Sequence, residues 1–238
     1  MTGFFHRLRG PIFVLFDYFT GKAELAEVVT AFFAAMVIIL VVFPIHECAH
    51  AVVAKWLGDD TAERRGQLTL NPFVHVDPMG ALLLLLCNIG WARPTPVDVR
   101  NCRKVSMRTA NALIAAAGPL ANILLSYLFM IIFKLLVFNG DSTVTTMYVC
   151  DAVAQIIMIN LYLGVFNLVP IPPFDGYKIL SSFLPAKAQH WFEKNQQVIY
   201  WVFFITLMMG FASIPLQYIS MGLMWVLDKM SFFLGVIF

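Results

Sequence analysis

Long apolar segments recur along the whole chain, with short polar stretches between them. The first runs from about residue 28 to residue 57, the second from about 110 to 138 and the third from about 145 to 169. Each exceeds the roughly 20 residues that an α-helix needs to cross about 30 Å of hydrocarbon. Pro44 lies inside the first segment, where its missing N–H can kink a helix. The pattern predicts three membrane-spanning helices.

Two shorter apolar segments follow toward the C-terminal end. The stretch from about residue 198 to residue 211 predicts a fourth span. The stretch at residues 215–238 contains Asp228 and Lys229, so it fits either a fifth span or a helix on the membrane surface. We therefore expect about one to three membrane helices in addition to the first three.

The N-terminal stretch Pro11–Phe19 is bulky and apolar but is interrupted by Asp17. Arg7 and Arg9 precede it, and no small-residue cleavage site follows, which disfavours a cleaved signal peptide. The stretch is too short to cross the hydrocarbon, and aromatic residues beside basic ones are typical of helices in the membrane interface. Residues 1–24 are therefore predicted to form an interfacial segment.

The region between the first two spans has a different pattern. Residues 79–91 are apolar but too few for a spanning helix. Residues 66–70 alternate polar and apolar side chains, and residues 94–99 hold two prolines that block a helix. Open strands are not tolerated in hydrocarbon, so these segments must be covered by protein or face a wet cavity. They predict a small β-like re-entrant element close to a functional site.

The composition agrees with this pattern. Of 238 residues, 60% are hydrophobic and 13% are charged, against about 45–50% and 25% in soluble domains. We expect an all-α polytopic membrane protein with one domain at 1–238, a three-helix core at 28–176 and C-terminal membrane helices at 177–238. The net charge of +2 gives no sign of nucleic-acid binding. Four scattered cysteines, without a C-x-x-C pair, disfavour a thiolate metal site or a disulfide framework.

Basic residues gather between Lys55 and Arg108, whereas the turn at residues 139–145 contains none. By the positive-inside rule, the basic side faces the cytoplasm. The first span then ends on that side with the sequence HECAH, and the third ends there with NLVPIPPFDG. This topology brings two polar motifs to one membrane depth.

The HECAH sequence places two histidines four residues apart. His46 and His50 then share one helix face and can offer imidazole nitrogens to one metal, with Glu47 about 100° away beside the coordination sphere. This pattern is typical of zinc proteases, in which Zn²⁺ lowers the pKa of a bound water and a glutamate accepts its proton. H-E-x-x-H also arises by chance, but three ionisable groups in an apolar span require a compensating role. We interpret the histidines as metal ligands.

A third ligand must come from elsewhere in the chain. Asp175 is the leading candidate because it follows an apolar span within the run PIPPFDG, whose prolines stop the helix and aim the carboxylate. The alternative is an ordinary turn aspartate before glycine. A second polar cluster, Asn71, His75 and Asp77, is interpreted as structural, although His75 could also bind a metal or a substrate.

Three motifs together resemble the site-2 protease family of intramembrane metalloproteases, peptidase family M50. They are HECAH, AAAGPLANILLS at residues 115–126 and FNLVPIPPFDG at residues 166–176. Residues 60–80 resemble the minimal bacterial branch of the family, which lacks a PDZ domain. The resemblance implies a catalytic core of three transmembrane helices, with zinc bound by His46, His50 and Asp175 and with Glu47 as the general base.

The same resemblance implies roles for two asparagines. Asn167 could hydrogen-bond the substrate backbone or stabilise an oxyanion, the alternative being simple helix-end polarity. Asn122 belongs with Gly118 and Pro119 to the family's G-P-x-x-N element, for which helix packing is the favoured role. Family members also place a β-like element beside the catalytic cleft, where an unwound substrate can add a strand.

The function that follows is a zinc-dependent intramembrane endopeptidase that cleaves transmembrane segments of other membrane proteins in the lipid bilayer. We expect a multi-pass protein of the bacterial cell membrane with its active site toward the cytoplasmic side. A membrane metal-ion transporter also uses inward-facing His and Asp, but it has no need for Glu47 beside two ligands. An inactive membrane scaffold would keep the same fold. The sequence leaves the substrate and the oligomeric state open.

Overall fold

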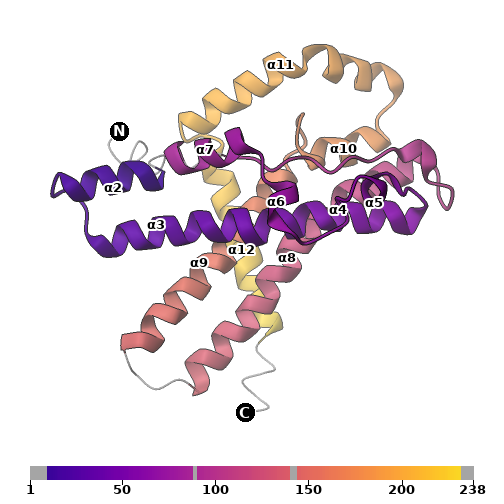
Figure 1. Ribbon diagram of the computed structural model, residues 1–238. Helices are drawn as coiled ribbons and strands as arrows, with labels where there is room; N and C mark the ends of the chain where they lie inside the picture. Colours follow the sequence, from indigo (N-terminus) through magenta and orange to yellow (C-terminus); the bar gives the residue numbers. More distant parts are fainter. Residues whose placement is uncertain (1–9, 88–89, 140–143, 232–238) are drawn as a thin grey trace.

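The computed structural model describes residues 10–87, 90–139 and 144–231, and these residues are mainly helical (Figure 1). Among them, three helices are long and apolar enough to cross a membrane: Leu25–Leu57, Met107–Phe138 and Val149–Asn167. They coincide with the three spans expected from the apolar pattern. At this level the prediction of an all-α membrane fold is confirmed.

The first span is one long helix in three parts. α3 (Leu25–Val37) continues through a π-helical turn, η1 (Ile38–Val42), into α4 (Phe43–Leu57). Pro44 has no N–H for the carbonyl four residues earlier, and the wider turn directly upstream absorbs this missing bond. Gly58, with a φ of 113°, ends α4 in the left-handed region. At 1.5 Å per residue the helix extends about 50 Å, so it must tilt or project beyond the hydrocarbon.

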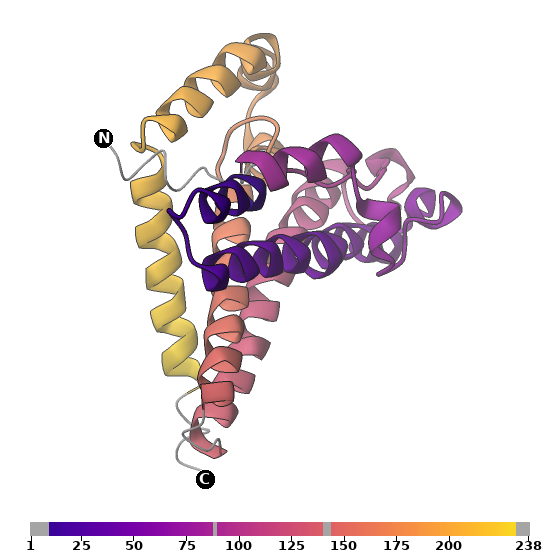
Figure 2. The same ribbon diagram turned by 60° about the vertical axis from the view of Figure 1, so that its left-hand side comes forward.

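The second and third spans form an antiparallel helical pair. α8 (Met107–Asn139) and α9 (Val144–Asn167) run side by side in both views (Figures 1 and 2). Met130 of α8 and Ile157 of α9 lie in one buried cluster between them. The N-terminal half of α8 packs instead against α4, where Ile114 belongs to a second buried cluster. The central helix α8 therefore joins the other two spans.

The N-terminal residues form a short helix at the expected place. α2 (Pro11–Phe19) folds back against α3 and also contacts α7 (Pro78–Cys87). The amide of Gly10 donates a hydrogen bond to the carbonyl of Leu86 over 3.0 Å. The helix is therefore braced by α7, while residues 1–9 of the expected interfacial segment lie outside the described residues.

The region between the first two spans contains short helices and extended chain. Besides α7, it holds α5 (Thr61–Arg64), α6 (Pro72–His75) and the 3₁₀ turn η2 (Val99–Asn101). The part of this region that the structure describes contains no strand, and an isolated antiparallel bridge joins Val76 to Ala92. The β-like element expected at residues 66–70 and 94–99 is therefore not confirmed.

Hydrogen bonds explain why residues 94–98 run extended without joining a ladder. Pro94 and Pro96 have no backbone N–H to donate. The amides of Thr95 and Asp98 donate instead to carboxylates, one on α4 and one just after it, each over 2.7 Å. Acidic side chains thus take the donors that a neighbouring strand would need.

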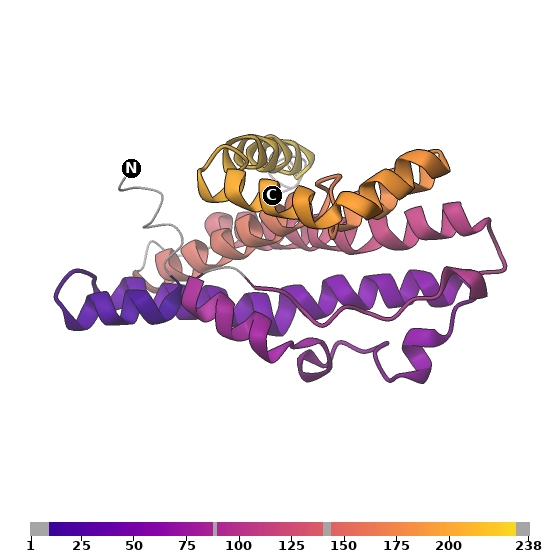
Figure 3. The ribbon, with the colours of Figure 1, turned by 90° about the horizontal axis from the view of Figure 1, so that it is seen from above.

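The C-terminal region consists of α10 (Asp175–Phe183), α11 (Ala186–Met208) and α12 (Ser213–Met230). Seen from above, α8 and α9 lie between the long α3–α4 helix on one side and α11 and α12 on the other (Figure 3). The fourth span expected at residues 198–211 corresponds to the second half of α11, whose first half is polar. Neither α11 nor α12 is among the candidate spans of the described residues. Further membrane helices are therefore not confirmed.

Candidate metal centre

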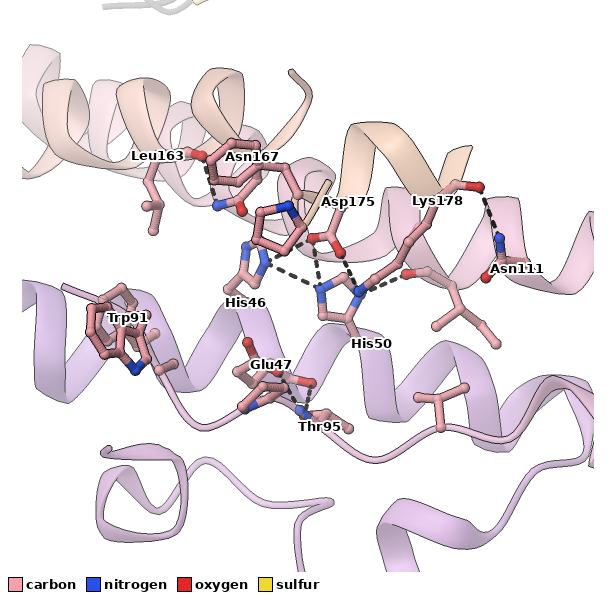
Figure 4. A pocket seen from close by; sticks show the side chains of 18 of the residues that line it. His46, Glu47, His50, Trp91, Thr95, Asn111, Leu163, Asn167, Asp175 and Lys178 are labelled. Carbon is pink, nitrogen blue, oxygen red and sulfur yellow. Dashed lines mark hydrogen bonds and ion pairs between the residues drawn. The ribbon is translucent and has the colours of Figure 1, made fainter. Parts of the chain in front are cut away.

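Three side chains from distant parts of the chain meet in the core. His46 and His50 lie one turn apart on α4, and Asp175 is the first residue of α10 (Figure 4). His46 Nε2 is 3.2 Å from Asp175 Oδ2 and 3.1 Å from His50 Nε2, and His50 Nε2 is 3.1 Å from the same carboxylate oxygen. All three residues are buried. The structure thus brings together the three residues predicted to bind the metal.

The donor atoms fit a metal ion. Zinc ligands about 2.0–2.2 Å from the ion in a tetrahedral arrangement stand about 3.3 Å apart, close to the separations in this cluster. Two imidazole nitrogens and a carboxylate oxygen that face one another need a cation or protons between them, because their lone pairs repel. Among the described residues, this is the one group of three such side chains close enough to hold a metal ion.

The position of Asp175 depends on a close approach of two backbones. A Cβ atom at Gly176 would collide with the carbonyl groups of Leu168 and Val169. Only glycine therefore allows the start of α10 to lie against the end of α9. The Asp-Gly pair does more here than form an ordinary turn, because it sets the Asp175 carboxylate against the two histidines.

The two oxygens of the Asp175 carboxylate have different partners, one of which is Lys178. Its Nζ lies 2.9 Å from Oδ1, whereas Oδ2 faces the histidines. Burial raises the pKa of Asp175, but hydrogen bonds with His46 and His50 and the charge of Lys178 outweigh it and hold the pKa well below its usual range. The carboxylate of Asp175 is therefore ionised at neutral pH and can act as an anionic metal ligand.

The central helix α8 contacts both histidines from behind. His50 Nδ1 lies 2.7 Å from the carbonyl oxygen of Ile114, and His46 Nδ1 lies 3.1 Å from the side-chain amide of Asn122. A Cβ atom at Gly118 would lie 2.5 Å from His50 Nε2 and 2.6 Å from His46 Nε2. The imidazoles therefore lie directly on the surface of α8, where only glycine fits.

Glu47 lies next to the cluster without joining it. Its Oε2 accepts a hydrogen bond from the Thr95 amide over 2.7 Å, and its backbone carbonyl accepts one from the Thr95 hydroxyl over 3.0 Å. Within the described residues, Oε1 receives no hydrogen bond. This carboxylate oxygen is available for a proton or a water molecule.

A cavity of about 690 Å³ connects these groups. His46, Glu47, His50 and Asp175 line it together with Asn167 at the end of α9. One N–H of the Asn167 amide donates to the carbonyl of the residue one turn earlier over 3.0 Å. Because a carboxamide has two N–H donors, the second remains for a ligand. The structure places Asn167 at the site, and its contact with substrate stays a prediction.

The second polar cluster has structural partners. Asn71 caps α6, because its side-chain oxygen accepts a hydrogen bond from the backbone amide two residues later over 3.1 Å. The carboxylate of Asp77 accepts a hydrogen bond from the backbone amide three residues later over 2.8 Å. His75 is fully buried, with Nε2 2.8 Å from a backbone carbonyl oxygen. These contacts agree with the structural interpretation of the cluster.

Two contributors to the site were not singled out from the sequence. Thr95 holds Glu47 mainly through its backbone N–H, and any residue except proline offers that donor. Lys178 follows Asp175 by three residues, a spacing that puts two helical side chains in reach of each other. The second contact could have been inferred from the sequence, whereas the first could not.

The chain is similar to known proteins. The model of peptidase family M50 matches residues 136–210, which include Asn167 and Asp175. A Bacillus subtilis protein named "Putative zinc metalloprotease YwhC" is 40% identical over 152 residues, which are 63% of this chain and 68% of the relative. The chain belongs to peptidase family M50, the site-2 protease family.

More distant relatives of this M50 protein carry similar names. "Putative zinc metalloprotease Rip2" of Mycobacterium tuberculosis H37Rv is 32% identical over 154 residues, 63% of this chain and 57% of the relative. "Putative zinc metalloprotease MJ0611" of Methanocaldococcus jannaschii is 31% identical over 139 residues, 58% of this chain and 64% of the relative. The chain spans less than two thirds of these two relatives. No solved structure matches it.

Proposed function

We propose that this M50 protein is a zinc-dependent endopeptidase that cleaves transmembrane segments of other membrane proteins. The proposal rests on the position of Glu47 beside the cluster of His46, His50 and Asp175, in the wall of one cavity and on an apolar helix. In this assignment the cluster holds zinc and Glu47 is the general base. The names of the relatives support zinc as the metal.

The chemistry divides between the metal and the side chains. Bound zinc supplies Lewis acidity, which polarises a water molecule and lowers its pKa toward about 7. Glu47 accepts the proton at Oε1, because Oε2 is held by the amide of Thr95. The protonated carboxyl group then gives this proton to the leaving amine. Asn167 has an N–H left to bond the substrate backbone or the developing oxyanion.

A transmembrane substrate must unwind before it can be cut. Its amides are satisfied inside its own helix, so the freed N–H and C=O groups need new partners in a site that excludes lipid. The cavity beside Glu47 is lined by five residues of the extended segment: Ala92, Pro94, Thr95, Val97 and Asp98. Their position supports strand-like pairing with the unwound substrate, which is the role we propose for the re-entrant region.

The charge distribution supports an orientation for the site. The C-terminal end of α4 lies near the N-terminal end of α8, and Arg64, Arg103 and Arg108 are exposed in this part of the molecule. By the positive-inside rule these residues face the cytoplasm. We propose a multi-pass protein of the bacterial cell membrane, with the cavity near its cytoplasmic surface.

The Glu47→Gln variant tests the proposal. The full chain and the Glu47→Gln variant are reconstituted with single-span reporter proteins that carry a Gly-Pro pair in the transmembrane segment, and cleavage is followed on gels. Zinc content is measured by mass spectrometry. We expect Glu47→Gln to keep zinc and to lose cleavage by about 100-fold or more.

The remaining outcomes separate the alternatives. Undiminished cleavage by Glu47→Gln would reject the proposed base. Zinc flux into the vesicles that is unchanged in Glu47→Gln, with no cleavage by either protein, would indicate a transporter. A chain that binds less than about half an equivalent of zinc, the same as its His46→Ala variant, would be a scaffold.

A further inference from the structure

We infer that Asn122 is a positioning residue of the metal centre: its side-chain carbonyl accepts the Nδ1 proton of His46 and so fixes the imidazole tautomer that offers Nε2 to the metal. This inference rests on the metal site proposed above. It gives Asn122 a role in metal binding, beyond the helix packing expected for its motif.

The contact between Asn122 and His46 is buried. Asn122 is fully buried on α8, and its carboxamide is 3.1 Å from His46 Nδ1. The other amide atom, Oδ1, has no hydrogen-bond partner among the described residues. A buried carbonyl oxygen without a hydrogen-bond donor is destabilising, so the orientation of the Asn122 amide requires an explanation.

Metal binding supplies the explanation. A histidine that gives the lone pair of Nε2 to a metal carries its proton on Nδ1, and this Nδ1–H needs an acceptor. Oxygen and nitrogen of a carboxamide are distinguished only by their hydrogen bonds, and a half-turn of the group exchanges them. That half-turn brings Oδ1 of Asn122 to His46 Nδ1–H, so the carbonyl gains a donor and the amide nitrogen takes the place that Oδ1 had.

The second histidine follows the same rule. His50 Nδ1 lies 2.7 Å from the carbonyl oxygen of Ile114, an atom that can only accept. The proton of His50 is therefore on Nδ1, and its Nε2 faces the cluster. Ile114 and Asn122 both belong to α8, so one helix sets the tautomers of both ligands.

Packing holds Asn122 in place. A Cβ atom at Gly164 of α9 would lie 3.2 Å from the carbonyl oxygen of Pro119 and 3.4 Å from the Cβ of Asn122, so the two helices are in close contact here. Ser126 donates to the backbone carbonyl of Asn122 and to that of Ile157 on α9, over 2.9 and 3.2 Å. These contacts hold the amide group of Asn122 next to His46. A second buried asparagine of this core has no such contact with the histidines in the described part of the chain.

That second asparagine is the matched control. Asn160 is also fully buried, on α9, and its Nδ2 donates to the carbonyl of Ile156 over 2.9 Å. Its Oδ1 also has no hydrogen-bond partner among the described residues, and no hydrogen bond joins it to the histidines there. Asn160→Leu removes a buried amide from the same helix pair without touching the metal site. A general effect of losing a buried amide would appear in both variants.

The test measures zinc affinity of the full chain in detergent micelles, by competition with a chromogenic chelator at fixed pH. Asn122→Leu should raise the zinc dissociation constant by about 10- to 100-fold, the usual effect of removing such a partner. Asn122→Asp keeps an acceptor oxygen and should bind zinc within about threefold of the natural chain or more tightly. Asn160→Leu should leave the affinity unchanged.

Equal affinities for Asn122→Leu and the natural chain would overturn the inference, as would equal weakening by Asn122→Leu and Asn160→Leu. Where Asn122→Leu does not fold, as judged by circular dichroism, a loss of more than about tenfold in Asn122→Asp would overturn it. The His46→Ala variant distinguishes a failure of the proposed metal site from a failure of the proposed role of Asn122. If His46→Ala keeps its zinc, the proposed metal site fails; if it loses zinc while Asn122→Leu retains it, only the role of Asn122 fails.

Discussion

The backbone amide of Thr95 donates to Oε2 of Glu47 over 2.7 Å, and the Thr95 hydroxyl donates to the Glu47 carbonyl over 3.0 Å. One residue of the extended segment thus fixes both the side chain and the main chain of the proposed base. A general base must stay within hydrogen-bond reach of the proton that it accepts. The segment at residues 92–98 therefore orients the proposed base and also contributes to the wall of the cavity.

The first prediction separates the two contacts of Thr95. Thr95→Pro removes the N–H, and we expect kcat to fall by about 10- to 100-fold because Glu47 is no longer oriented. Thr95→Val keeps the N–H and removes only the hydroxyl, so kcat should fall by about threefold or less. Both variants should keep their zinc, as measured by mass spectrometry. Equal losses in the two variants would contradict an orienting role for the amide.

The second prediction concerns the charge beside Asp175. Lys178→Met removes the partner of Oδ1, and the carboxylate can then turn away from the histidines. We expect the zinc dissociation constant to rise by about tenfold, whereas Lys178→Arg should stay within about threefold. Lys187→Met, at an exposed position early in α11, is the control. Chelator competition measures all three, and an unchanged affinity in Lys178→Met would reject the prediction.

Local patterns predicted the parts of the fold that depend on local forces. An apolar run longer than about 20 residues has few alternatives to a spanning helix, so the three long segments were placed within a few residues. The histidine pair needed only the helical period. Asp175 needed the topology as well, since it lies 129 residues after His46 and its position depends on the close approach at Gly176.

Long-range contacts account for what the sequence did not predict. Residues 94–99 were expected to form β-like structure, but two of their donors bind Glu47 and Asp59, residues that are distant in sequence. The start of α11 was not predicted, because the first half of this helix is polar and only its second half is as apolar as a membrane span. Asn122 was assigned to packing, since nothing in one sequence indicates that its amide faces His46.

The third prediction uses the contact between α8 and the imidazoles. A Cβ atom at Gly118 would lie 2.5–2.6 Å from ring atoms of His46 and His50, closer than real contacts allow. Gly118→Ala should displace both rings and weaken zinc binding by more than about tenfold. At Gly222 of α12 a Cβ atom would meet nothing within 4 Å, so Gly222→Ala is the control and should bind zinc normally. Normal zinc affinity in Gly118→Ala would show that the helices can move apart.

The fourth prediction concerns the anchor of the extended segment, Asp59. Asp59 is fully buried and accepts hydrogen bonds from the amide of Asp98 over 2.7 Å and from the side chain of Asn101 over 3.0 Å. Burial raises its pKa, but hydrogen bonds from Thr61, Asn101 and backbone amides outweigh burial and lower the pKa. The folded state therefore favours the ionised carboxylate.

The sign of the pH effect follows from that lowered pKa. The stabilisation by Asp59 is complete above the pKa of the unfolded chain, about 3.9, and is lost as the pH falls through the lower pKa of the folded chain. Asp59→Asn should reduce the free energy of unfolding by about 1–3 kcal/mol at pH 7, because an amide cannot accept all these bonds. Its deficit relative to the natural chain should shrink at lower pH. Thermal unfolding in micelles between about pH 7 and pH 3 measures this, with Asp60→Asn, an exposed neighbour, as the control. A deficit that stays constant with pH would mean that Asp59 stabilises the segment through its shape alone.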